Sequence, residues 1–142
     1  MKDDTDQAAN AGKTVLAKHR LSLRVRYSET DQMGTFYNSR ALEWFEVART
    51  ELMRSTGRPY TQWEEQGYLL PLVESHVYYR GRARYDDLLQ ADVSMEMAGP
   101  ASLRFEVKIV QAESGQVVVE GYTIHAITKP DGKPTRPPQW LK

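Results

Sequence analysis

Apolar and polar side chains alternate along residues 19–28, the first stretch of the chain with a regular pattern. One set of alternate positions holds His19, Leu21, Leu23, Val25 and Tyr27, and arginine or serine occupies each position between them. Successive side chains of a β-strand point to opposite faces of the sheet. This period of two therefore predicts a strand with one buried face and one solvated face.

A helix is predicted over residues 38–56, where the apolar period lengthens to that of an α-helix. Stepping by 100° per residue gathers one wide apolar stripe: Ala41, Leu42, Phe45, Ala48, Leu52 and Met53. Asn38 or Ser39 can cap the first turn, and Gly57 followed by Pro59 ends the helix. The helix would be about 28 Å long, and a stripe this wide is typical of a helix packed on a sheet.

Four further strands are predicted, over residues 69–83, 88–97, 102–112 and 116–128, after a short helix at 61–66. The gaps at residues 98–101 and 113–115 are short and contain turn-forming residues, which favours hairpins and antiparallel pairing. The order of a strand, a long helix and four strands predicts an α+β fold, with one antiparallel sheet packed on one helix. Residues 129–142 hold four of the seven prolines and are expected to be extended.

The composition is that of an ordinary folded domain, expected over residues 15–142, because 40% of the 142 residues are hydrophobic and 27% are charged. Residues 1–14 are polar and are expected to form a disordered tail. The formal net charge is zero, without the basic excess typical of proteins that bind nucleic acids. No apolar run is long enough for a membrane span or a signal peptide, and there is no cysteine, so a cytoplasmic protein is expected.

Candidate chemistry is sparse outside one loop. The three histidines lie within predicted strands without triad spacing, and no motif for a nucleotide, a nucleophilic serine or zinc is present, so no cofactor and no metal is expected. The loop at residues 28–40 places Asp31 and Gly34 just before a helix start, whose free N–H groups can stabilise an oxyanion. Spacing alone leaves two interpretations open. Asp31 activates water or attacks a carbonyl, or it caps a turn in which Gly34 adopts a positive φ.

Residues 27–57 read YSETDQMGTFYNSRALEWFEVARTELMRSTG, which resembles the signature of the 4-hydroxybenzoyl-CoA thioesterase-like family. Members show Asp-x-x-Gly after a strand, then aromatic residues, then a helix close to F-F-E-x-A-R-x-E. Residues 84–95 and 132–138 resemble two later family elements, in the same order. The resemblance implies a hotdog fold, a five-stranded antiparallel sheet wrapped around one long central helix. It also implies homodimers or homotetramers paired edge to edge, and an acyl-CoA thioesterase that releases free acid and CoA.

Carried over residue by residue, the resemblance makes Asp31 the catalytic nucleophile or general base. It assigns the oxyanion donor to the backbone N–H of Asn38, on the first turn of the helix. Many relatives have a histidine where this chain has Asn38, and asparagine cannot titrate. Glu46 is the second choice for the working carboxylate, although a structural i,i+3 ion pair with Arg49 is the favoured role for it.

Substrate binding is assigned to Gly34 and Tyr37 in the loop, and to Arg80, Arg82 and Arg84. The three arginines alternate along a predicted strand, which places them on one face, where they would bind CoA phosphates or simply meet solvent. Two alternatives stay open: a hotdog protein that binds acyl-CoA without hydrolysing it, and an interaction protein with a vestigial site. A hotdog dehydratase is disfavoured, because it would need a catalytic histidine near the helix.

Overall fold

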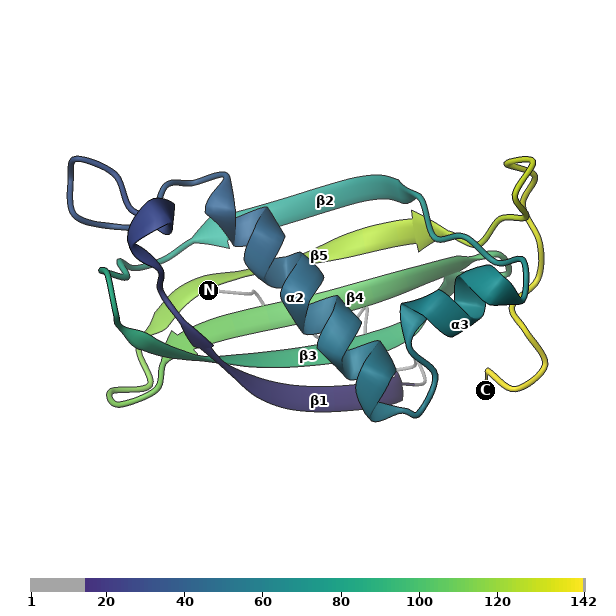
Figure 1. The fold of residues 1–142 in the computed structure, drawn as a ribbon, viewed down its shortest axis with the longest axis horizontal. Coiled ribbons are helices and arrows are strands. Elements are labelled where there is room, and N and C mark those ends of the chain that lie inside the picture. The colour runs from purple at the N-terminus through teal and green to yellow at the C-terminus, as the bar shows by residue number, and fades with distance from the viewer. Residues whose placement is uncertain (1–14, 142) are drawn as a thin grey trace.

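The computed structural model describes residues 15–141. Its elements in chain order are β1 (Val15–Arg24), a 3₁₀ turn (Tyr27–Glu29), α2 (Arg40–Ser55), α3 (Tyr60–Glu65), β2 (Leu72–Tyr79), β3 (Leu88–Gly99), β4 (Ser102–Gln111) and β5 (Val117–Ala126) (Figure 1). The tail predicted at residues 1–14 lies outside the described residues. Among the helices that are described, none is long and apolar enough to cross a membrane.

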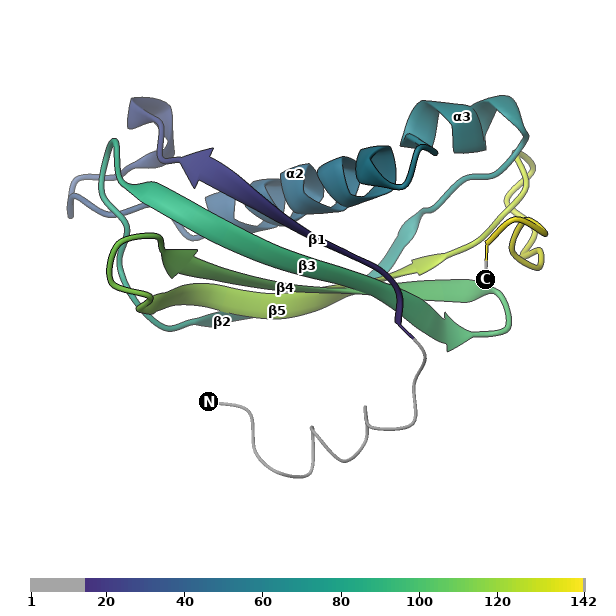
Figure 2. The ribbon, with the colours of Figure 1, turned by 90° about the horizontal axis from the view of Figure 1, so that it is seen from below.

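The five strands form one antiparallel sheet in the order β1-β3-β4-β5-β2, which leaves β1 and β2 at the edges. Short hairpins join β3 to β4 and β4 to β5, as the turn residues predict. Figure 2 shows α2 lying across one face of this curved sheet, with α3 beyond its end. The predicted α+β hotdog architecture, a five-stranded antiparallel sheet around a long helix, is confirmed.

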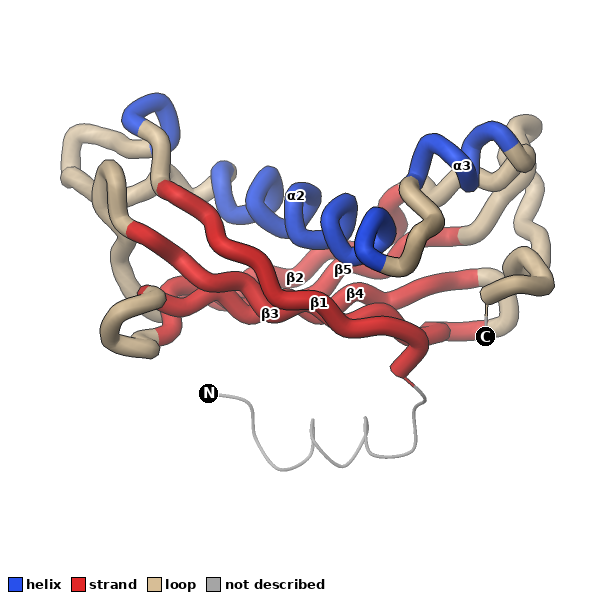
Figure 3. Tube along the Cα trace, turned by 60° about the horizontal axis from the view of Figure 1, so that its bottom comes forward, coloured by secondary structure: helices blue, strands red, loops and turns tan. Residues whose placement is uncertain are grey.

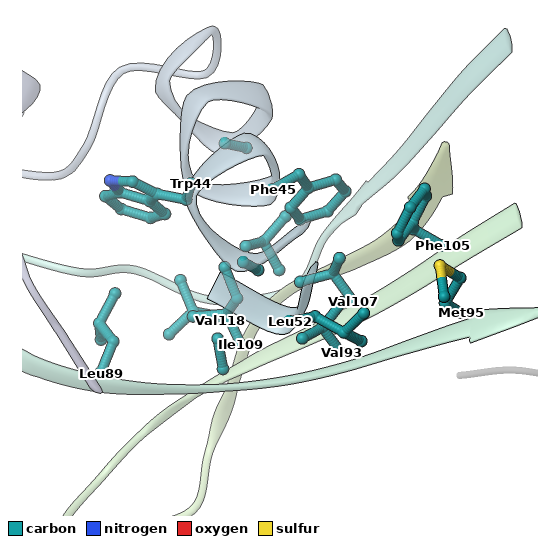
Figure 4. Packing of buried hydrophobic residues seen from close by; sticks show 14 of the residues in the cluster. Trp44, Phe45, Leu52, Leu89, Val93, Met95, Phe105, Val107, Ile109 and Val118 are labelled. Atoms are coloured by element: carbon teal, nitrogen blue, oxygen red, sulfur yellow. The ribbon is translucent and has the colours of Figure 1, made fainter. Parts of the chain in front are cut away.

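The core lies between α2 and the inner face of the sheet (Figure 4). Val93, Met95 and Phe105 are among the inward side chains of β3 and β4 that α2 covers, and each fully buried side chain of this kind contributes about 1.5–3 kcal/mol. The predicted helix stripe is buried at Ala41, Phe45, Ala48, Leu52 and Met53. It is wrong at Leu42, which is 38% exposed. Trp44 faces the core instead, with its ring centroid 4.8 Å from that of buried Phe36.

Two predicted boundaries at the start of the chain are wrong for local reasons. The first strand ends at Arg24, because the chain then turns into the 3₁₀ segment, where the Glu29 N–H donates to the Arg26 carbonyl. Tyr27 is consequently 76% exposed rather than buried on the strand face. Helix α2 begins at Arg40, so Asn38 lies in the turn before the helix and not on its first turn. Ser39 is the N-cap residue, but its side chain makes no capping hydrogen bond.

The strand predicted over residues 69–83 is shorter in the structure, since β2 ends at Tyr79. The ladder stops there because the N–H groups of Arg80 and Gly81 both donate to the Val118 carbonyl, at 2.9 Å each. Gly81 passes so close to β5 that a Cβ on it would lie 2.7 Å from the Val117 oxygen. The chain therefore leaves the sheet and forms a loop over residues 80–87. In Figure 3 this loop lies at the end of the sheet where α2 begins.

Candidate active site

The loop that carries Asp31 is held against the loop at residues 80–87 by main-chain hydrogen bonds. At its base, the Val25 N–H donates to the Asp87 oxygen at 3.0 Å, and the Phe36 N–H donates to the Ala83 oxygen at 2.9 Å. Both loops are strand exits at the same end of the molecule, beside the start of α2 (Figure 1). This pairing brings Arg84 and Asp31 to the same pocket although the two are far apart in the sequence.

Asp31 occupies a tight turn whose geometry is set by its own side chain. Its Oδ1 accepts the Met33 N–H at 2.8 Å, and its carbonyl accepts the Gly34 N–H at 3.0 Å. Gly34 adopts φ 79°, a value that glycine reaches without steric cost. The turn interpretation left open by the sequence is therefore observed. This turn uses only one oxygen of the carboxylate, because Oδ2 of Asp31 makes no hydrogen bond to the described residues.

An open pocket of about 570 Å³ surrounds this carboxylate. Its lining residues are Tyr27, Thr30, Asp31, Gln32, Gly34, Arg84 and Tyr85. The rings of Tyr27 and Tyr85 meet edge to face, with centroids 5.5 Å apart. Three of the predicted site residues, Asp31, Gly34 and Arg84, thus share one pocket.

Glu29 is a residue of this site that sequence reasoning missed. It is only 3% exposed, and its carboxylate accepts the Arg26 N–H at 2.7 Å and the Trp44 Nε1–H at 2.9 Å. The Arg26 guanidinium adds an ion pair at 3.3 Å. Glu29 therefore ties the loop to α2 through a buried, charge-assisted set of hydrogen bonds. Its opposite charge three residues after Arg26 is the signal that could have found the ion pair.

The turn before α2 presents two consecutive backbone donors, the N–H groups of Asn38 and Ser39. Neither makes a hydrogen bond to any residue between 15 and 141, whereas the Arg40 N–H donates to the Tyr37 carbonyl. The Asn38 carbonyl accepts the Tyr79 hydroxyl at 2.8 Å and the Ala41 N–H at 3.3 Å. Free N–H groups at the positive end of a 16-residue helix can stabilise an anion.

The prediction that Arg80, Arg82 and Arg84 share one strand face is wrong, because residues 80–87 leave the sheet. Arg80 is engaged elsewhere: it forms an ion pair of 3.4 Å with Glu120, and its guanidinium lies 4.7 Å from the Tyr78 ring centroid. The Arg82 side chain is exposed, and its carbonyl accepts a hydrogen bond from the Gln111 side chain. Only Arg84 lines the pocket of Asp31. Tyr37, half exposed, is not among the residues that line it.

Glu46 lies at a second, smaller cavity of about 190 Å³, between α2, the start of α3 and the sheet. Its lining residues are Glu46, Arg49, Thr50, Met53, Tyr60, Leu70, Phe105 and His125. The expected ion pair between Glu46 and Arg49 is not among those formed by the described residues. Burial lowers the pKa of Arg49, and the charge of Glu46 opposes that shift. The two side chains therefore share one cavity without forming an ion pair.

His125 is a core residue, 4% exposed. Its Nδ1 lies 3.0 Å from the Leu70 carbonyl, which can only accept, so Nδ1 carries the proton. Nε2 then accepts the Thr123 hydroxyl at 3.0 Å. Burial lowers the pKa of His125, with the backbone hydrogen bond to Leu70 opposing the shift and the charge of Arg49 adding to it. Both ring nitrogens are therefore occupied by hydrogen bonds within the core, which leaves neither free to contact a substrate.

A family model described as the thioesterase-like superfamily matches residues 25–142, which include the Asp31 loop and all of α2. The chain is 40% identical to YneP of Bacillus subtilis, provisionally named an acyl-CoA thioesterase, over 65 residues that make up 46% of this chain and 47% of that protein. The chain thus spans about half the length of this relative. It is 32% identical to the acyl-CoA thioesterase YbgC of Haemophilus influenzae, over 63% of this chain and 66% of that one.

The fold has close counterparts among solved structures. The 1,4-dihydroxy-2-naphthoyl-CoA thioesterase Slr0204 of Synechocystis superposes with a TM-score of 0.80, covering 86% of this chain and 90% of that one. At 22% identity that likeness concerns the fold alone. The family predicted from residues 27–57 is confirmed. The chain belongs to the thioesterase-like superfamily.

Proposed function

We propose that this protein hydrolyses an acyl-CoA thioester to the free carboxylic acid and CoA, with Asp31 as the catalytic carboxylate. The observation that carries the proposal is the family match over residues 25–142, together with the free Oδ2 of Asp31 in an open pocket. The Met33 N–H holds one oxygen of this carboxylate, and the other oxygen is unbound. This arrangement suits a group that must hold its position while it reacts. Such a carboxylate attacks the thioester carbonyl or removes a proton from the attacking water.

The negative charge that develops on the thioester oxygen needs a donor, and the turn before α2 offers it. The unbound N–H groups of Asn38 and Ser39 follow Asp31 by a few residues and precede a long helix. Because these donors belong to the main chain, they do not depend on the side chain that occupies position 38. Loss of one donor of this kind typically costs about 100- to 1,000-fold in rate.

Arg84 is the arginine best placed to bind a CoA phosphate. It shares the pocket of Asp31, and it makes no ion pair with the described carboxylates. Arg82 is a second candidate because its side chain is exposed. Arg80 is the weakest of the three, since Glu120 already pairs with its guanidinium. Gly34 and Tyr37 stay in the proposal as residues of the loop that the acyl-CoA would cover.

Glu46 is the alternative catalytic carboxylate, and its cavity supports that role less well. It stands beside Arg49 rather than beside a free backbone donor. The helix rise places it about 12 Å beyond Asn38, too far to act on the same carbonyl as the N–H groups before α2. We therefore assign Glu46 to the neighbourhood of the acyl group and not to the reaction.

We also propose that the working form is a homo-oligomer built through the β2 edge. Leu72 and Val73 on this edge strand are 54% and 65% exposed, and an edge with apolar side chains pairs readily with another strand. Light scattering after gel filtration should give a dimer or a tetramer. Replacing Val73 by lysine should shift the population toward monomer, and a wild-type protein that elutes as a monomer would refute the edge contact.

The test of the activity is release of free thiol from short, long and aromatic acyl-CoAs. The wild-type protein should release thiol from at least one of them, and Asp31→Asn should abolish most of the release without changing the melting temperature. Thiol release that persists in a folded Asp31→Asn protein would move the reaction to another carboxylate, with Glu46→Gln as the next variant. Tight binding of acyl-CoA without thiol release would identify a binding protein instead.

A further inference from the structure

The Tyr79 hydroxyl reaches the turn before α2 from the sheet. It belongs to the last residue of β2 and donates to the Asn38 carbonyl at 2.8 Å. The ring of Tyr79 stacks on Phe36, with centroids 6.2 Å apart and planes inclined by 24°. Phe36 is buried against Trp44, so the hydroxyl is held by an aromatic stack rooted in the core.

The Asn38 carbonyl and the Ser39 N–H belong to the same peptide group. A trans peptide is planar, and its N–H points opposite to its C=O. By fixing the direction of the Asn38 carbonyl, Tyr79 therefore also fixes the direction of the Ser39 N–H. That N–H is one of the two free donors before α2. The carbonyl of the same peptide, that of Asn38, accepts two hydrogen bonds, from the Tyr79 hydroxyl and from the Ala41 N–H.

Hydrogen bonds to a carbonyl polarise the whole peptide and make its N–H a stronger donor. The Ser39 peptide receives this polarisation from both partners, and it also lies at the positive end of α2. The peptide that carries the Asn38 N–H has only one such hydrogen bond, from Arg40 N–H to the Tyr37 carbonyl. Of the two free donors, Ser39 N–H is thus the more strongly polarised and the more firmly oriented.

We propose that Tyr79 is a positioning residue of the thioesterase site, which orients the Asn38–Ser39 peptide so that the Ser39 N–H stabilises the oxyanion. This inference rests on the proposed function and deepens one part of it, because it gives the Ser39 N–H, beside that of Asn38, a residue that orients it. Tyr79 acts through the peptide and does not touch the reacting atoms. Its contribution grows as charge develops on the thioester oxygen, so it belongs to kcat rather than to KM.

Tyr79→Phe removes the hydroxyl and keeps the ring that stacks on Phe36. We expect kcat to fall about 3- to 10-fold, the usual worth of one neutral hydrogen bond, with little change in KM or melting temperature. Tyr78→Phe is the matched control, since Tyr78 is the preceding residue of β2, faces the other side of the sheet beside Arg80, and should keep wild-type kcat. An unchanged kcat in Tyr79→Phe, or a rise in KM alone, overturns the proposal.

Ser39→Pro tests the donor itself. Ser39 has φ −66°, the value that the proline ring imposes, so proline removes the N–H without straining Ser39 itself. Because proline also disfavours the αR conformation for the preceding residue, Asn38, the melting temperature of the variant is measured first. We expect kcat to fall on the order of 100- to 1,000-fold, as for other oxyanion donors. Ser39→Ala, which keeps the N–H, should lower kcat far less. A folded Ser39→Pro protein with more than a tenth of wild-type kcat would exclude Ser39 N–H as the donor.

A spectroscopic readout separates positioning from a general effect on the fold. With a ¹³C-labelled acyl-CoA bound to Asp31→Asn, the thioester carbonyl band in the infrared should lie below that of the free ligand. Adding Tyr79→Phe should move the band back toward the free value, and no movement would overturn the proposal. Failure of the wild-type protein to release thiol from any acyl-CoA refutes the proposed function. If only the Tyr79 inference fails, the wild-type protein releases thiol, and Tyr79→Phe and Ser39→Pro release it at the same rate.

Discussion

Two aspartate turns in this protein share one kind of hydrogen bond, from the aspartate carboxylate to the N–H two residues later, and differ in their surroundings. In the first, Asp31 Oδ1 accepts the N–H of Met33 at 2.8 Å, and a glycine with φ 79° follows. In the second, Asp131 Oδ1 accepts the N–H of Lys133 at 2.9 Å, around Gly132 with φ 88°. A carboxylate that caps its own turn is therefore no evidence of a catalytic role.

The surroundings of the two turns are what distinguish them. The Asp31 turn is held to the 80–87 loop and to α2, and it shares a pocket with Arg84. The turn at residues 129–133 is closed mainly by its own main chain, through Lys129 N–H to the Lys133 carbonyl at 2.9 Å, and it is exposed throughout. In Figure 1 it lies at the other end of the sheet, beyond β5. Comparing matched variants of the two turns therefore separates chemistry from turn formation.

The largest difference should come from replacing each aspartate by asparagine. Asparagine can still accept the same turn hydrogen bond, so both variants should melt within about 1 °C of each other. Asp31→Asn removes the negative charge with which the carboxylate attacks the thioester or takes a proton from water. We therefore expect kcat to fall on the order of 100- to 10,000-fold. Asp131→Asn should keep wild-type kcat. Equal activities in the two variants would mean that Asp31 is only a turn residue.

The second difference concerns what anchors the turns. Glu29→Ala leaves the Arg26 N–H and the Trp44 Nε1–H without their acceptor, at about 1–3 kcal/mol for each buried donor. We expect the free energy of unfolding to drop by about 2–4 kcal/mol. Hydrogen exchange should speed up over residues 26–37 and stay unchanged over 129–133. Uniform acceleration at both turns would show that Glu29 supports the fold as a whole rather than this loop.

The comparison also explains how much the sequence could predict. The alternation at residues 19–25, the helix stripe and the hairpin turns are local patterns, and they were sufficient to predict the sheet and the helix on it. The pairing of the 25–39 and 80–87 loops is not local, and it decides that Arg84 joins Asp31 while Arg80 turns to Glu120. Strand periodicity predicted Arg80, Arg82 and Arg84 on one face because it assumed that the strand continues to residue 83. It gave no sign that β2 ends at Tyr79, just before the close approach of Gly81 to β5.

The same limit applies at the start of the helix. Asn38 was expected on the first turn of α2, yet the helix begins at Arg40, and the donors precede it. Tyr79 reaches them from a strand 41 residues later in the chain, a contact that no spacing rule predicts. For Asp31 itself, spacing left both a catalytic role and a turn role open. Only the family resemblance of residues 27–57 favoured it, and that resemblance was confirmed at the level of the family.

A third difference should appear in substrate affinity. Arg84→Met removes a cation that lines the pocket of Asp31, and KM for acyl-CoA should rise about tenfold, as expected for one charge-assisted hydrogen bond to a phosphate, with kcat nearly unchanged. Arg136→Met, an exposed arginine near the Asp131 turn, is the control and should leave KM as it is. The effect of Arg84→Met should shrink in high salt. A fall in kcat instead would place Arg84 in the reaction rather than in CoA binding.

The smallest expected effect comes from replacing the glycine of each turn by alanine. It distinguishes the two turns cleanly because the substitution is the same in both. A Cβ on Gly34 or on Gly132 would meet no atom within 4 Å, so alanine at either position adds only the cost of a positive φ, about 1–2 kcal/mol. Chemical denaturation should show a similar loss of unfolding free energy for Gly34→Ala and Gly132→Ala. Only Gly34→Ala should also lower kcat/KM, since any shift of its turn moves the Asp31 carboxylate relative to the N–H groups before α2. If both variants lose stability equally and both keep kcat/KM, the position of the Asp31 turn does not matter for the reaction, and the catalytic carboxylate must be sought on α2.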